Sequence, residues 1–134
     1  MPALTTDRRT QERLPGIREP GVLAGATIYA GAMVAIDAAG WAVPAAAVAA
    51  HRVIGRAEAR VAGGATSGAN LVRVKTGVFK YANSAAGDLI ARADIGQPAY
   101  VVDDQTVAKT SATNTRPVAG TIYDVDADGV WVRF

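Results

Sequence analysis

Short runs of alternating apolar and polar residues, separated by glycine-rich turns, constrain the fold of this chain most strongly. In the run 53–61, valine, glycine and alanine alternate with Arg56, Glu58 and Arg60. The run 71–75 repeats the pattern, with valines expected to face inward and basic residues outward. A period of two residues is typical of a β-strand that has one face in solvent.

Further apolar segments are joined by residues typical of turns, and these pairs predict β-hairpins. The pairs are Thr27–Asp37 with Trp41–Val43, Tyr100–Asp103 with Thr106–Lys109, and Pro117–Val125 with Val130–Phe134. In the last turn, Asp128-Gly129 is expected to supply positive φ. One short helix is predicted at Ala85–Ala93, because Asn83-Ser84 resembles a helix start and Gly96 and Pro98 follow. The sequence thus predicts an all-β fold, a small β-barrel or β-sandwich with one short helix.

The chain of 134 residues has room for one domain, which we expect at 22–134. Residues 1–21 form a predicted extended arm, because prolines and glycines interrupt any helix there. Leu14 and Ile17 in this arm would become ordered against a neighbouring subunit. A frayed terminus explains the same residues, and the sequence leaves both interpretations open.

The composition predicts assembly into a homo-oligomer. Half of the residues are hydrophobic, but many of these are alanine, whose small side chain contributes little to a core. Tryptophan and tyrosine favour half-exposed positions at edges and interfaces. The candidate contacts to other subunits or to a partner protein are Arg8, Arg9, Arg13, Leu14, Ile17, Arg18, Trp41 and Trp131.

Residues that could carry catalysis or hold a metal are scarce. The absence of cysteine excludes disulfides, thiolate nucleophiles and cysteine-ligated metals. His51 is the only histidine and is expected to be a surface or packing residue. Asp124-x-Asp126-x-Asp128-Gly129 matches the start of an EF-hand loop but lacks the glutamate at the twelfth position, and an acidic hairpin turn explains it. We expect no enzyme activity, no catalytic residue, no cofactor and no metal.

Charge and hydropathy give no indication of nucleic acid or a membrane as partner. The net charge of +2 is small and spread along the chain. Basic side chains are predicted on the outer face of two strands, at Arg56, Arg60, Arg73 and Lys75. Glu58 lies among them and no aromatic residues are interleaved for stacking on bases, so we expect a solvated or subunit-facing surface. No run approaches the length of a membrane span, and the polar N-terminal segment does not resemble a signal peptide, so we expect a soluble, unsecreted protein.

Several segments taken in order resemble the decoration, or capsid cement, proteins of tailed bacteriophages, especially those of Mu-like phages. The first is Gly77-Val78-Phe79, which follows an alternating strand. The others are 95–108, Val118-Ala119-Gly120 and 126–132. The resemblance as a whole covers roughly residues 25–134.

The resemblance implies a β-barrel-like domain that assembles as a homotrimer on the outer surface of the phage capsid, after synthesis in the host cytoplasm. There it would lock neighbouring major capsid proteins together, and no catalytic residue is implied. A virion adaptor, or a host- or glycan-binding β-module of the tail or baseplate, is the alternative. Copy number distinguishes the two, because the copy number of a cement protein approaches the number of capsid subunits.

Overall fold

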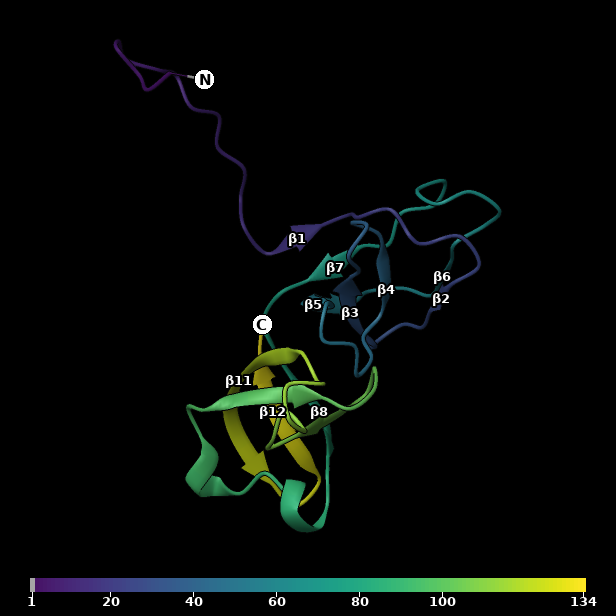
Figure 1. The fold of residues 1–134 in the computed structure, drawn as a ribbon, viewed down its shortest axis with the longest axis vertical. Coiled ribbons are helices and arrows are strands. Elements are labelled where there is room, and N and C mark those ends of the chain that lie inside the picture. The colour runs from purple at the N-terminus through teal and green to yellow at the C-terminus, as the bar shows by residue number, and fades with distance from the viewer. Residues whose placement is uncertain (1) are drawn as a thin grey trace.

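The computed structural model describes residues 2–134 and confirms the all-β fold (Figure 1). The first sheet has the order β1-β7-β5-β3-β4, and β2 pairs separately with β6. The remaining strands form a closed barrel in the order β10-β8-β12-β11-β9. The strands are β1 (Ile17–Arg18), β2 (Thr27–Ile28), β3 (Met33–Ile36), β4 (Ala42–Pro44), β5 (Arg52–Ala57), β6 (Val61–Ala62), β7 (Val74–Lys75), β8 (Val78–Asn83), β9 (Pro98–Val101), β10 (Thr106–Ala108), β11 (Val118–Asp126) and β12 (Gly129–Arg133).

The first predicted hairpin is present as β3 and β4, which pair antiparallel around residues 37–41. Asp37 stabilises the turn, because its Oδ1 accepts hydrogen bonds from the backbone N–H groups of Ala39 and Trp41, both at 2.9 Å. Gly40 has φ of 94° there, a conformation that glycine adopts without steric cost. The beginning of the predicted strand, Thr27–Ile28, instead pairs with β6.

The two predicted hairpins of the barrel, β9–β10 and β11–β12, are also confirmed. The expectation of positive φ at Asp128-Gly129 is wrong, since neither residue has it. Instead Asp126 Oδ1 accepts hydrogen bonds from the N–H groups of Asp128 at 2.8 Å and Gly129 at 3.1 Å. Glycine is needed at 129 because a Cβ would collide with the carbonyl oxygen of Tyr81 on β8.

The first sheet and the barrel share a hydrophobic core. Met33 and Ala35 on β3 pack with the apolar side chains inside the barrel. Val34, between them, points to a second cluster on the opposite face of the sheet. Because side chains alternate across a strand, β3 is buried on both faces and joins the two parts into one body.

The predicted helix at Ala85–Ala93 is wrong. The segment contains two 3-10 turns, η1 (Ala86–Asp88) and η2 (Arg92–Asp94), with extended backbone at Leu89 between them. No side chain caps the first turn, and neither turn has a buried residue. Ile90 is the buried residue between the turns, so one apolar anchor takes the place of the continuous apolar face that stabilises a helix.

The two alternating runs form shorter strands than predicted. The run 53–61 is interrupted after Ala57 and resumes as β6, although the N–H of Glu58 still bonds to the carbonyl of Arg73. In the run 71–75, only Val74–Lys75 forms a strand. Val72 and Val74 are nevertheless fully buried, as the alternation predicts.

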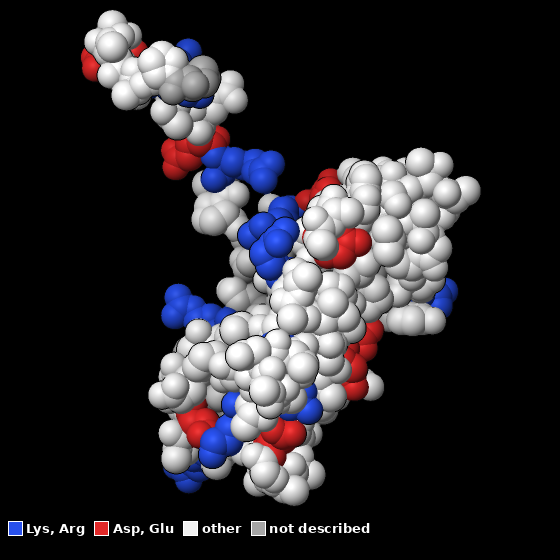
Figure 2. All heavy atoms as spheres, viewed as in Figure 1, with Lys and Arg blue, Asp and Glu red and all other residues white. Residues whose placement is uncertain are grey.

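The N-terminal arm projects from the body as an extended segment over residues 2–16 (Figure 1). Basic and acidic side chains alternate along it (Figure 2). Residues 17–21 of the predicted arm belong instead to the sheet, because β1 pairs with β7 and Gly21 bridges to Leu71. The free arm is therefore anchored at its base by an edge strand.

Candidate functional site

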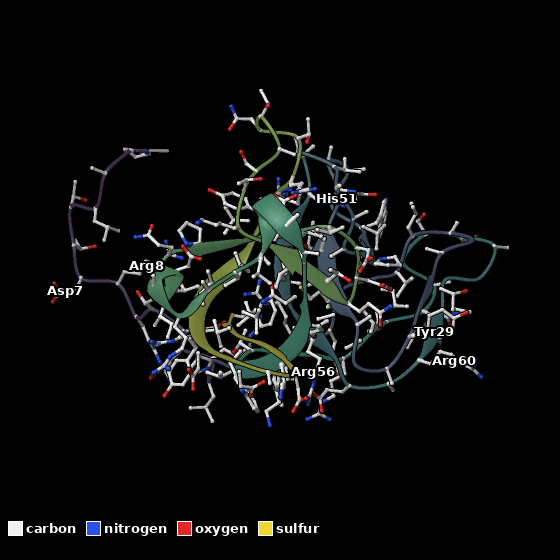
Figure 3. All side chains as sticks on the ribbon, turned by 90° about the horizontal axis from the view of Figure 1, so that it is seen from below. Asp7, Arg8, Tyr29, His51, Arg56 and Arg60 are labelled. Carbon is white, nitrogen blue, oxygen red and sulfur yellow. The ribbon has the colours of Figure 1, made fainter. Side chains whose placement is uncertain are left out.

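The predicted contact residues lie in separate places and do not form one site. Arg8, Arg9, Arg13 and Leu14 are exposed on the free arm, and Ile17 and Arg18 lie on β1 at its base. Trp41 lies in the turn before β4 of the first sheet, and Trp131 lies on β12 of the barrel. Seen from below, Arg8 stands to one side of the body, while Tyr29 and Arg60 lie on the opposite side (Figure 3).

Trp41 is a packing residue that holds the beginning of the domain. Its ring lies against Gly21 and Gly68, where added Cβ atoms would come within 3.2 Å and 2.7 Å of its Cζ3. Any larger residue at these two positions would therefore displace the indole. Trp41 therefore packs against the chain at Gly21, just after the arm, and holds it against the loop at Gly68.

Trp131 lies on the outside of the barrel, in a network with two charged residues. Its Nε1 donates a hydrogen bond to Asp126 Oδ2 at 3.1 Å, while Lys80 Nζ lies 2.9 Å from Asp126 Oδ1. The lysine ammonium also lies 5.6 Å from the centroid of the indole ring. The bond from Lys80, together with those from the Asp128 backbone and Trp131, lowers the pKa of Asp126 to about 2.

The central carboxylate of the EF-hand-like motif, Asp126, is already bound in this network. Asp126 serves the hairpin turn and Lys80, and Asp124 Oδ1 accepts a bond from the N–H of Val125. Within residues 2–134, no three histidine, cysteine, aspartate or glutamate side chains are arranged to hold a metal ion.

His51 lies between the loop after β4 and strand β5, on the opposite side of the body from Arg56 (Figure 3). Its Nδ1 is buried and has no hydrogen-bond partner among the described residues. An imidazole that acts as general base requires an orienting partner at this nitrogen. His51 lacks this orienting contact among residues 2–134.

Of the four basic residues predicted to share a surface, Arg56 and Lys75 lie side by side, and Glu58 partly neutralises them. Arg56 lies 3.9 Å from the centroid of the Phe79 ring and 2.7 Å from Glu58 Oε1. Lys75 is the partner of Arg56 across β5 and β7. The bond from Arg56, and the positive charges of Lys75 and Arg73, lower the pKa of Glu58. Arg56 thus connects the first sheet to the barrel.

An open groove of about 1140 Å³ lies at the end of the barrel, and we call it the end groove. One wall is the segment with the two 3-10 turns, and the other is the tip of the β11–β12 hairpin. The residues that line it are Ala82, Asn83, Leu89, Ile90, Ala91, Arg92, Ala93, Asp124, Val125, Asp126, Ala127, Asp128 and Gly129.

Asn83 fixes the first wall of the end groove. Its Nδ2 donates to the carbonyl of Ile90 at 2.8 Å, and its Oδ1 accepts from the N–H of Ile90 at 2.9 Å. This double contact holds Ile90 in the core and leaves Leu89 beside it 48% exposed. The wall is apolar where Leu89 and the alanines lie, and Arg92 adds one positive charge.

The opposite wall carries Asp124, Asp126 and Asp128. Lys80 Nζ lies 2.9 Å from Asp126 Oδ1 and 3.7 Å from Asp128 Oδ2, although the Asp128 side chain is 87% exposed. Asp124 has no ion pair among the described residues. The EF-hand-like motif identifies the aspartates of this wall in the sequence. No pattern in the sequence predicts that they lie beside the segment 89–93. The end groove was therefore missed by reasoning from the sequence.

No helix in residues 2–134 has the length and apolar character to cross a membrane. Comparisons of the chain with family models, with curated proteins and with solved structures found no match.

Proposed function

We propose that this protein is a structural component of a tailed-phage virion. It binds the outside of the head as a homotrimer and stabilises the contacts between major capsid proteins. The proposal rests on the resemblance of segments between residues 77 and 132 to capsid cement proteins, together with the free N-terminal arm.

The arm is the structural observation that supports the proposal most directly. Leu14 is 85% exposed and Leu4 is 71% exposed, which leaves large apolar side chains without a partner in their own chain. An extended segment that projects into solvent buries little of its own apolar surface. It gains favourable free energy when a second protein covers its apolar side chains. Such a segment suits a protein that acts by attachment to others.

The body suits the same role because it holds the arm at a defined point. The base of the arm pairs with β7, and the N–H of Thr76 donates to the carbonyl of Gly16 at 2.8 Å. Force applied to the arm is therefore transmitted to the first sheet and, through the shared core, to the barrel. On a shell, each repeated copy adds its own binding free energy against internal pressure.

Cryo-electron microscopy of purified virions tests this proposal through the position and copy number of the chain. We expect density in trimers over the head lattice, with a copy number close to that of the major capsid protein. Density restricted to a ring at the tail, the baseplate or the portal would overturn the proposal and favour the virion adaptor.

A further inference from the structure

We propose that the free arm of one copy docks in the end groove of a second copy, so that copies join head to tail. The inference rests on the homotrimer of the proposed function and specifies which parts of the chain form its contact. The occupant is a segment of the same protein, residues 2–16.

The arm and the end groove lie at opposite ends of the molecule. The arm leaves the first sheet at one end, and the 3-10 turns and the β11–β12 tip lie at the other end (Figure 1). Residues 2–16 span at most about 50 Å when fully extended, which is enough to reach along a neighbouring copy. A contact between opposite ends of identical chains is heterologous, and a small number of copies can close it into a ring.

The two surfaces match in polarity. The end groove offers apolar contact at Leu89 and Val125, and Leu14 on the arm is the most exposed large apolar side chain of the described residues. Burial of Leu14 against Leu89 removes two exposed leucines from water. Pro15-Gly16, which follow Leu14, keep this part of the arm out of a helix and therefore available to lie along the groove.

The two surfaces also match in charge. The groove lining has three carboxylates against one guanidinium, and Asp124 and Asp128 are exposed at its rim. Lys80 pairs with Asp126 and Asp128, so Asp124 is the groove carboxylate without an ion pair among the described residues. The free arm has three arginines against two acids. With Leu14 in the groove, Arg13 beside it lies within reach of the aspartates, where guanidinium and carboxylate form paired hydrogen bonds.

Disulfide trapping tests the contact, because the chain contains no cysteine. The variant Leu14→Cys with Leu89→Cys is oxidised mildly and separated on a non-reducing gel. We expect disulfide-linked dimers and trimers. The matched control is Leu14→Cys with Leu71→Cys, since Leu71 is 54% exposed but lies on the first sheet side of the molecule. The control pair is expected to give at least about tenfold less linked product.

Charge reversal provides a second test of the same contact. Asp124→Lys with Asp128→Lys is expected to reduce trapping about tenfold, since it places positive charge on both surfaces. Arg9→Glu with Arg13→Glu added to that variant is expected to restore trapping. Circular dichroism verifies that each variant is folded, so a loss of trapping reports on docking.

Two outcomes would overturn the inference. Equal linkage in the groove pair and the control pair would show that the arm does not prefer the groove. A disulfide within one chain would show that the arm folds back on its own body. Binding to phage heads is measured separately: if trapping fails but heads still bind the protein through the arm, the arm contacts capsid protein and the proposed function stands. If trapping succeeds but heads do not bind it, the proposed function fails and the inference stands.

Discussion

The indole Nε1 of Trp131 and the carboxylate of Asp126 form a hydrogen bond of 3.1 Å across the last hairpin. The same carboxylate accepts two backbone N–H groups of the turn and pairs with Lys80 on the adjacent strand β8. One side chain thus closes the turn and ties the hairpin to its neighbour. It also forms part of a wall of the end groove.

Replacement of Asp126 by asparagine is expected to destabilise the protein in a pH-dependent way. The folded-state pKa of Asp126 is lowered to about 2 from an unfolded value near 3.8, so its stabilising contribution is present above pH 4 and is lost as pH falls through 2. The difference in free energy of unfolding between wild type and Asp126→Asn should therefore shrink between pH 4 and pH 2. Urea unfolding at several pH values measures it. Asp124→Asn is the control, and a difference that persists undiminished at pH 2 would contradict the prediction.

Replacement of Tyr81 by phenylalanine is expected to loosen the junction between the barrel and the first sheet. The Tyr81 hydroxyl donates to the carbonyl of Gly31 at 2.9 Å, and loss of such a bond costs about 1 kcal/mol. Burial raises the pKa of Tyr81 above that of an unfolded tyrosine. The protonated hydroxyl therefore contributes fully to the free energy of unfolding below pH 10, and this contribution is lost as the pH rises toward the folded-state pKa. Wild type should lose more stability than Tyr81→Phe on going above pH 10, as followed by denaturant unfolding. The exposed Tyr123→Phe should behave like wild type, and a parallel decline in all three proteins would refute this account.

Replacement of Asn83 by alanine is expected to release the first wall of the end groove. It leaves the backbone N–H and carbonyl of Ile90 without their partner, at a cost of about 2 kcal/mol. Hydrogen exchange should accelerate in residues 85–94 beyond the change caused by global destabilisation. Gln11→Ala on the arm is the control, because it removes a side-chain amide that lies outside the groove. It should leave the free energy of unfolding and the hydrogen exchange of residues 85–94 unchanged. Unaltered exchange in the Asn83 variant would show that other contacts hold the wall.

Replacement of Gly55 by alanine is expected to disturb the pairing of β5 with β7. Gly55 has φ of 147°, and an added Cβ would lie 2.6 Å from the carbonyl oxygen of Lys75. Overpacking of this kind costs about 2 kcal/mol, which thermal and denaturant unfolding detect. Gly87→Ala is the matched control, because its Cβ meets no atom within 4 Å. Equal stability of the two variants would disprove the close approach.

Deletion of residues 2–16 is expected to leave the body folded while weakening attachment to phage heads. β1 and its pairing with β7 remain and the bond from Thr76 to Gly16 is lost, so the free energy of unfolding should stay within about 1 kcal/mol of wild type. Co-sedimentation with heads measures attachment, and the full-length chain is the reference. Unfolding of the shortened protein would show that the arm is part of the core, and undiminished attachment would show that the arm does not bind the capsid.

The local pattern of the sequence determined most strands and hairpins. Alternation identified Val72 and Val74 as buried, and turn residues located the hairpin β3–β4 and both barrel hairpins. These features could be predicted because strand period and turn chemistry depend on residues that are close in the chain.

The sequence by itself determined an all-β chain with short hairpins and a polar arm that lacks helix-forming character. The tertiary structure alone decided that the hairpins close into a barrel, that 85–93 forms two turns around Ile90, and that these turns face Asp124 and Asp128 across a groove. The physical reason is that barrel closure and the groove depend on contacts between residues tens of positions apart. Local periodicity carries no information about which distant segments will meet.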